Sequence, residues 1–186
     1  HQQEFEVNVA FLGKINAGKT FVMNLITGAS AENLPHKSTE GISIKRWVIS
    51  GSLHGALMVD TEGTDRIVPN PLKECFESEG VASWGKYHDY IQQTLALSIS
   101  TLPILVTTEP SVSMRHQAIK IMQYTGACIE KEGATKPPIL IIVYNFYQFA
   151  KRKQVTSLFN ASVVQAFNCR YDDIFTCYYS TSRVKN

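Results

Sequence analysis

The sequence GKINAGKT, residues 13–20, matches the pattern G-x-x-x-x-G-K-[ST]. It lies between an alternating apolar run from Glu4 to Leu12, which predicts a strand, and an apolar run from Lys19 to Thr27, which predicts a short helix ending at Gly28. Glycines in such a turn let backbone N–H groups point at an anion, the lysine adds positive charge, and the threonine hydroxyl can ligate Mg²⁺. The stretch therefore predicts a site for nucleotide phosphates. Its predicted binding residues are Gly13, Asn16, Ala17, Gly18, Lys19 and Thr20.

Length and composition fit one compact domain over residues 1–186, which we treat as a single unit of what could be a longer protein. The formal charge of +2 is small and the basic residues are dispersed, so we expect no nucleic-acid partner. The four cysteines have no C-x-x-C spacing, which argues against zinc and favours reduced thiols. No apolar stretch approaches the roughly 20 residues that span a bilayer. We therefore expect a cytoplasmic protein with no transmembrane segment in this chain, any membrane association being left to other segments.

Strand and helix patterns alternate along the rest of the chain. A hairpin-like pair of strands is expected at 42–49 and 55–59, with further strands at 102–107, 139–145 and 174–179, and helices at 84–98, 112–129 and 154–167. The run 139–145 is apolar enough for a central strand covered on both faces. This order predicts a three-layer α/β fold with a mainly parallel six-stranded sheet, one antiparallel edge strand and helices on both faces.

In such a sheet, ligands bind where the strands end at their carboxyl edge. Asp60-Thr61-Glu62-Gly63 is a D-x-x-G pattern after an apolar strand, so Asp60 is expected to hold Mg²⁺ and the Gly63 N–H to approach a γ-phosphate. Thr39 lies in the connection before the hairpin, where its hydroxyl can complete the metal shell. The candidate metal ligands are therefore Thr20, Thr39 and Asp60, and the candidate catalytic residues are Lys19, Thr39 and Ser38.

Three segments together resemble the large GTPase domains of the guanylate-binding protein and atlastin group, within the dynamin-like GTPases: residues 13–20, Thr39-Glu40-Gly41-Ile42 and Val59-Asp60-Thr61-Glu62-Gly63. The similarity continues through Ala96-Leu97-Ser98 and covers about residues 5–146. The resemblance implies a P-loop NTPase fold of the GTPase type, hydrolysis of GTP with Mg²⁺, and dimerisation across the nucleotide face. It also implies that Gly13, Lys19 and Thr20 contact phosphate and metal, that Thr39 belongs to a first switch, and that Asp60 and Gly63 belong to a second.

The chain departs from this family inside the phosphate loop. Asn16 stands where family members often carry an arginine that stabilises the charge of the transition state. Such an arginine contributes on the order of 10³–10⁵ in rate. Slow hydrolysis is therefore expected unless Lys14, Lys37 or Arg66 substitutes.

Two further departures concern the attacking water and the base. Thr64 follows Gly63 where small GTPases have a glutamine, so backbone carbonyls or Ser38 must position the water. Asn145 ends a strand where the family has Arg-Asp, and an amide matches only one of the two adjacent donors of guanine. Either backbone groups and Ser180 compensate or base selectivity is relaxed; we expect guanine over adenine.

The leading hypothesis is a Mg²⁺-dependent GTPase whose switch segments, 34–41 and 63–81, respond to the γ-phosphate and control self-association. A second hypothesis is a nucleotide-binding scaffold with little or no hydrolysis, which Asn16, Thr64 and Asn145 favour. A third, weaker one is a P-loop ATPase.

Overall fold

The structure is a computed structural model that describes residues 5–28, 39–48, 55–64, 78–109, 111–131, 139–146 and 151–161. Contacts along the chain divide it into two compact units, residues 1–145 and 146–186. Each unit is described by itself, and the sheet belongs to the first.

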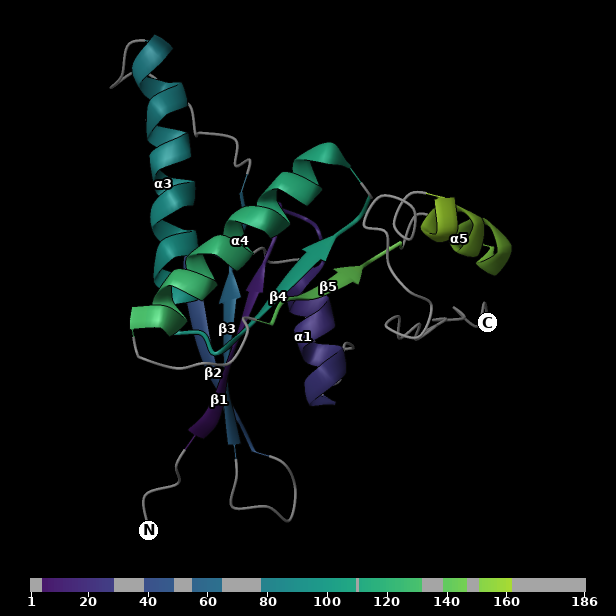
Figure 1. Cartoon of the computed structure of the whole chain (residues 1–186), viewed down its shortest axis with the longest axis horizontal. Helices are drawn as coiled ribbons and strands as arrows, with labels where there is room; N and C mark the ends of the chain where they lie inside the picture. The colour runs from purple at the N-terminus through teal and green to yellow at the C-terminus, as the bar shows by residue number, and fades with distance from the viewer. Residues whose placement is uncertain are drawn as a thin grey trace. The chain divides into compact units, whose positions relative to one another are not determined.

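A five-stranded sheet forms the centre of the first unit (Figure 1). Its order is β2 (Ile42–Val48), β3 (Gly55–Thr61), β1 (Phe5–Leu12), β4 (Leu102–Thr107) and β5 (Ile141–Tyr144). β2 runs antiparallel to β3, and the other three pairings are parallel. The mainly parallel sheet with one antiparallel edge strand is confirmed, whereas the expected sixth strand at 174–179 lies outside the described residues.

Helices cover both faces of this sheet (Figure 1). α1 (Lys19–Thr27) lies on one face, and α3 (Ser78–Ser98) and α4 (Val112–Lys131) lie on the other. α1 ends where the sequence predicts, because Gly28 adopts a left-handed conformation (φ 67°) and its N–H bonds back to the last turn. The helix-on-both-faces arrangement is therefore confirmed.

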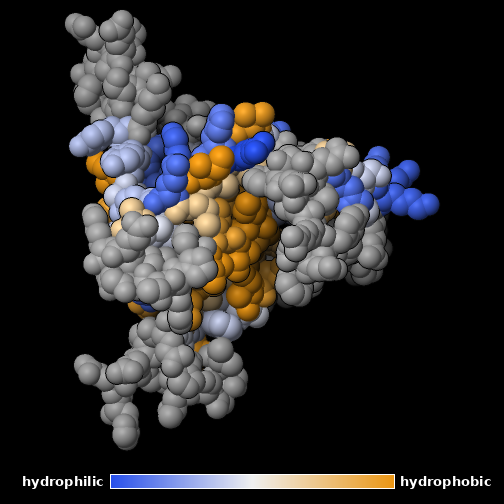
Figure 2. Space-filling view, in the orientation of Figure 1, coloured by the Kyte–Doolittle hydropathy of each residue, from blue (hydrophilic) through white to orange (hydrophobic). Residues whose placement is uncertain are grey.

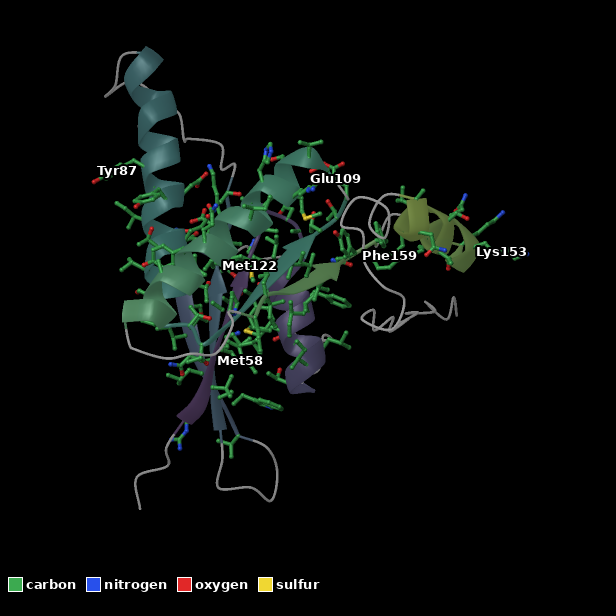
Figure 3. The ribbon with its side chains drawn as sticks, in the orientation of Figure 1. Met58, Tyr87, Glu109, Met122, Lys153 and Phe159 are labelled. Carbon is green, nitrogen blue, oxygen red and sulfur yellow. The ribbon has the colours of Figure 1, made fainter. Side chains whose placement is uncertain are left out.

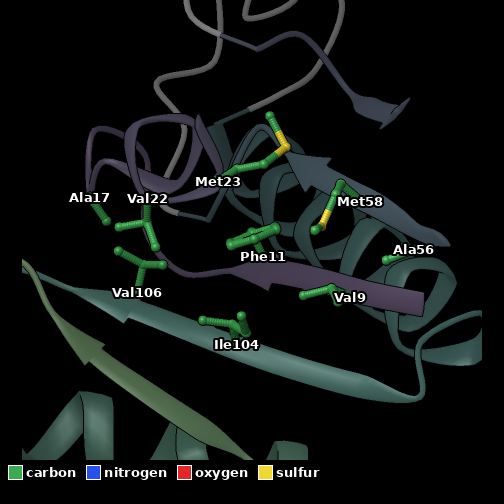
Figure 4. Close-up of a cluster of buried hydrophobic side chains, with 9 residues drawn as sticks. All are labelled: Val9, Phe11, Ala17, Val22, Met23, Ala56, Met58, Ile104 and Val106. Atoms are coloured by element: carbon green, nitrogen blue, oxygen red, sulfur yellow. The ribbon is translucent and has the colours of Figure 1, made fainter. Parts of the chain in front are cut away.

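Alternation along the strands divides the core between the two faces. The face toward α1 buries a cluster built around Phe11, which is fully buried (Figure 4). The members of this cluster are Val9, Phe11, Ala17, Val22, Met23, Ala56, Met58, Ile104 and Val106. The intervening strand residues Ala10, Leu12 and Leu105 are also buried, as are residues of α3 and α4.

The boundaries of β3, α3 and β5 differ from the sequence-based expectation in ways that affect the sheet or the site. β3 continues to Thr61, so Asp60 lies inside the strand rather than after it, because pairing with β2 extends to Ile42 opposite Thr61. α3 begins at Ser78, six residues before the expected start, in a stretch with little apolar periodicity. β5 spans only 141–144 and has β4 as its one neighbour among the described strands, so the central strand of that sheet is β1.

The described part of the second unit is α5 (Arg152–Phe159). Lys151 precedes it in an extended conformation (φ −112°), and its carbonyl accepts the first backbone bonds of the helix from Gln154 and Val155. Lys153 is exposed and extends away from the helix (Figure 3). Lys151 is exposed as well, so the two lysines at the start of this helix face solvent.

Exposed apolar side chains occur on both faces of the first unit. Tyr87 and Tyr90 on α3 are each 66% exposed, and Figure 3 shows Tyr87 pointing away from the helix. Apolar surface also lies over β5 and α1 in Figure 2, where Ile141 and Leu25 are each 41% exposed. Within the part of the chain that the structure describes, none of the helices has both the length and the apolar character needed to cross a bilayer.

The core assignment predicts different costs for two phenylalanines. Phe11→Ala should lower the free energy of unfolding by about 3–5 kcal/mol, because it leaves a cavity between β1 and α1. Phe21→Ala on α1, where the side chain is 39% exposed, should cost less than about 1.5 kcal/mol. Urea denaturation followed by circular dichroism measures both, and equal losses would contradict the burial of Phe11.

Candidate functional site

The turn from β1 into α1 is a compact loop fixed by unusual backbone conformations. Asn16 (φ 60°) and Gly18 (φ 86°) are both left-handed, which turns successive peptide groups toward one concave side. The Ala17 N–H donates to the Lys14 carbonyl across the turn at 3.2 Å. A Cβ on Gly13 (φ 139°) would collide with the Val106 carbonyl of β4, so this position requires glycine. The loop therefore has the shape of an anion-binding turn.

Lys19, the first residue of α1, reaches back into this loop. It is only 5% exposed, and its Nζ donates to the carbonyls of Lys14 (2.8 Å), Glu62 (3.1 Å) and Gly13 (3.4 Å). Burial lowers the pKa of Lys19 to about 8, and the charges of Asp60 and Glu62 act in the opposite direction. The site thus holds an ammonium group out of water beside the loop.

Three predicted metal ligands from distant parts of the sequence, Thr20, Thr39 and Asp60, lie within hydrogen-bonding distance of one another. Asp60 is 1% exposed, and its Oδ2 accepts hydrogen bonds from the hydroxyls of Thr20 (2.6 Å) and Thr39 (2.8 Å). The two hydroxyl oxygens are 3.1 Å apart. Asp60 Oδ1 is buried and has no hydrogen-bond partner among the residues that the structure describes. An unpaired buried carboxylate oxygen is costly, and with the two hydroxyls it forms the all-oxygen donor set that Mg²⁺ prefers.

The residues after Asp60 connect this carboxylate to the loop. The Thr64 N–H donates to the Gly13 carbonyl (3.1 Å), and the Thr64 carbonyl accepts from Ile15 N–H (2.9 Å). Gly63 (φ 106°) lies so close that a Cβ would stand 2.5 Å from Lys19 Nζ and 2.7 Å from Ile15 N. Gly63 is therefore required to be glycine both by its conformation and by its neighbours.

Asn145 follows β5 and contacts the other side of the loop. Its Nδ2 donates to the Ala17 carbonyl at 3.0 Å, and its backbone N–H donates to the Thr107 carbonyl at 2.7 Å. A Cβ on Gly18 would collide with this amide. The structure therefore places Asn145 beside the loop. Its Nδ2 is bound to the loop, and Oδ1 is the other polar atom of the amide.

The structure thus gathers most of the predicted site residues in one place. The gathered residues are Gly13, Asn16, Ala17, Gly18, Lys19, Thr20, Thr39, Asp60, Gly63 and Asn145. Ser38 and Ser180 lie outside the described residues, as do Lys37 and Arg66, so those assignments stay predictions.

Sequence reasoning assigned no role to Glu62. It is 7% exposed; its carboxylate accepts the Gly41 N–H at 3.1 Å, and its backbone N–H donates to the Gly41 carbonyl at 2.8 Å. The sequence offered one signal that Glu62 is buried at the site, namely its position in the D-x-x-G segment. A carboxylate between a metal ligand and a close-packed glycine has little access to water.

Comparison with known proteins identifies the fold. No protein-family model and no curated protein sequence matches the chain. Among solved structures, a variant of Era from Aquifex aeolicus bound to GDP·AlF4⁻ is 17% identical, with a TM-score of 0.55 over 87% of this chain and 48% of that chain. Era in complex with MgGDPNP and nucleotides 1506–1542 of 16S ribosomal RNA is 16% identical, with a TM-score of 0.52 over 87% of this chain and 47% of that chain.

These matches show that the chain has a P-loop GTPase fold, and that it spans about half the length of the Era chains. They do not confirm the finer resemblance to the guanylate-binding protein and atlastin group. The second Era structure contains RNA, which does not fit our expectation of no nucleic-acid partner.

The environment of Lys19 predicts a pH dependence of stability. Between its folded pKa of about 8 and its ordinary value of 10.5, the unfolded chain binds more protons at this lysine than the folded chain does. Stability therefore rises with pH in that range, and the cost of burying the charge is fully present below pH 8.

Comparison with Lys19→Met isolates this contribution, because the variant keeps the aliphatic bulk and lacks the titrating group. Between pH 7.5 and 10.5 the free energy of unfolding of the wild type should rise relative to that of the variant, by up to about 3 kcal/mol. Urea denaturation at intervals of pH provides the measurement. Parallel pH profiles for the two proteins would show that the lysine is not buried as described.

Proposed function

We propose that this chain binds a guanine nucleoside triphosphate together with Mg²⁺ and hydrolyses it slowly to the diphosphate and phosphate. The observation that carries the proposal is the carboxylate of Asp60, which gathers Thr20 and Thr39 at Oδ2 and whose buried Oδ1 has no hydrogen-bond partner among the described residues. A divalent cation would satisfy that oxygen. The P-loop GTPase fold supports the same conclusion at the level of the fold.

The phosphates would be bound by the loop and Lys19. The N–H groups of Ile15 and Ala17 already bind carbonyls of Thr64 and Lys14, so those of Asn16, Gly18 and Lys19 are the expected backbone donors. The Lys19 ammonium, now on three backbone carbonyls, would exchange them for phosphate oxygens, which carry full negative charge and form stronger bonds.

Thr20, Thr39 and Asp60 would hold the metal, which when bound neutralises the charge that develops on the phosphates. The Gly63 N–H would contact the γ-phosphate, since no side chain stands in its way. Thr39 and Gly63 belong to the two proposed switch segments, 34–41 and 63–81. We further propose, on the sequence resemblance, that these segments respond to the nucleotide and govern self-association across the nucleotide face.

Guanine is the proposed base, with Asn145 and Ser180 as its proposed contacts. Asn145 offers one acceptor oxygen, Oδ1, where a carboxylate would offer one to each of the two adjacent guanine donors, and its Nδ2 already donates to the Ala17 carbonyl. Discrimination against adenine should therefore be modest.

A nucleotide-binding scaffold with little hydrolysis is the second candidate function. It is favoured by Asn16, whose neutral side chain cannot replace a charge-stabilising arginine, and by Thr64, whose backbone is bound to the phosphate loop on both sides. In the first candidate, Ser38 or backbone carbonyls would orient the attacking water, and a lysine such as Lys14 would supply charge.

Nucleotide binding tests the proposed site. The wild type should bind GTP more tightly than ATP or XTP, and removal of Mg²⁺ with a chelator should weaken GTP binding. Lys19→Ala should lose roughly 100-fold in affinity, because it removes the charge expected at the phosphates.

Lys45→Ala on β2, where the side chain is exposed, is a matched control that should bind GTP like the wild type. Calorimetric or fluorescence titration measures each of these affinities. Unchanged GTP affinity in the Lys19 variant would overturn the placement of the phosphates.

Turnover separates the two candidate functions. We expect release of phosphate from GTP above background, falling at least about tenfold in Asp60→Asn, because the amide replaces a metal-binding oxygen and its charge. Single-turnover assays over a range of protein concentrations measure this. Mg²⁺-dependent binding without turnover at any concentration would select the scaffold.

A further inference from the structure

Glu62 connects two segments of the site through paired hydrogen bonds with Gly41. Its backbone N–H donates to the Gly41 carbonyl at 2.8 Å, and its carboxylate Oε2 accepts the Gly41 N–H at 3.1 Å. Its own carbonyl accepts from Lys19 Nζ at 3.1 Å. We propose that Glu62 is a positioning residue that holds Thr39 at the metal site, an inference that rests on the proposed function.

The two bonds to Gly41 have different origins. The antiparallel pairing of β2 with β3 ends at Ile42 opposite Thr61, so the bond from Glu62 N–H to the Gly41 carbonyl continues the ladder by one residue. Any residue at position 62 could make that bond. The second bond needs the carboxylate, which takes the Gly41 N–H where the ladder has ended. The side chain of Glu62 therefore prolongs the strand pairing by one more bond, toward Thr39.

Thr39 is two residues from this anchor. Two residues span at most about 7 Å, so a fixed Gly41 confines the Thr39 hydroxyl to a small region. That region includes Asp60, because Thr39 Oγ1 donates to Asp60 Oδ2 at 2.8 Å and is 3.1 Å from Thr20 Oγ1. The left-handed conformation of Gly41 (φ 68°) directs the chain through this turn, and no atom of the described residues lies within 4 Å of a Cβ built there.

Burial strengthens the hydrogen bond from the Gly41 N–H to the Glu62 carboxylate. Glu62 is 7% exposed, so water competes little for Oε2, and a bond from an amide to a charged oxygen is stronger than one to a neutral acceptor. The third metal ligand is then in place before any nucleotide arrives, and its ordering entropy is lost on folding rather than on binding. Loss of the carboxylate should weaken metal binding chiefly through Thr39, while Thr20 and Asp60 stay in position; its charge also favours the ammonium form of Lys19, an effect that does not require Thr39.

A double-mutant cycle between Glu62 and Thr39 tests this route. The measured quantity is the Mg²⁺ concentration at half saturation, for binding of a fixed concentration of a non-hydrolysable GTP analogue. Glu62→Ala should raise that concentration about tenfold in the wild-type background, and by less than about twofold in the Thr39→Ala background. A residue that only stabilised the fold would produce additive changes, which would overturn the inference.

Conservative variants keep the test informative if Glu62→Ala folds poorly. Glu62→Gln retains an acceptor oxygen of the same reach and should restore most of the Mg²⁺ response, whereas Glu62→Asp is one methylene shorter and should behave like Glu62→Ala. Glu109→Ala, which removes an exposed carboxylate outside both proposed switch segments, should leave the response unchanged. A Glu62→Gln response equal to that of Glu62→Ala would also overturn the inference.

The same data distinguish failure of this inference from failure of the proposed function. A wild type that binds the analogue with no Mg²⁺ dependence would reject the metal site and, with it, the role of Glu62. A wild type that depends on Mg²⁺ and shows additive losses in the cycle would reject the role of Glu62 alone.

Discussion

The carboxylate of Asp60 is the contact on which the site depends. It lies almost fully inside the protein, on the sheet face covered by α1, and it joins a helix residue, Thr20, to a residue before β2, Thr39. A buried charge of this kind is tolerated only when its oxygens are satisfied, and within the described part of the chain one of the two has no partner. The fold thus maintains an incomplete polar centre in its interior, and an oxygen-binding cation of small radius would complete it.

Lys19 balances this centre electrostatically. Its ammonium is held by three backbone carbonyls rather than by a carboxylate, so the lysine is satisfied in the free protein and still available to an anion. Because water is largely excluded, each interaction is stronger than it would be at the surface. The same exclusion of water lowers the pKa of Lys19, so this lysine loses its proton at a lower pH than an exposed lysine does.

Patterns within short stretches of sequence predicted the helices and strands whose formation depends on neighbouring residues. The strand before the loop, the helix Lys19–Thr27 with its glycine cap, and the strand Leu102–Thr107 all follow from alternation, periodicity and glycine placement. The start of α3 could not be predicted in this way, because residues 78–83 carry little apolar periodicity and include Gly80. The amide of Asn145 on the Ala17 carbonyl and the carboxylate of Glu62 on Gly41 join residues far apart in sequence, so only the tertiary structure reveals them.

The position of β1 in the sheet has a consequence for synthesis on the ribosome. β1 is made first, but its two partners arrive much later in the chain: Val9 pairs with Met58 on one side and with Leu102 on the other. Pairings this distant must close long loops, so they form slowly and leave an apolar strand unprotected meanwhile. The turn that follows β1 cannot acquire its shape until β4 has emerged, since Gly13 packs on Val106. A nascent chain that stalled before that point would contain the G-x-x-x-x-G-K-[ST] sequence without the folded loop.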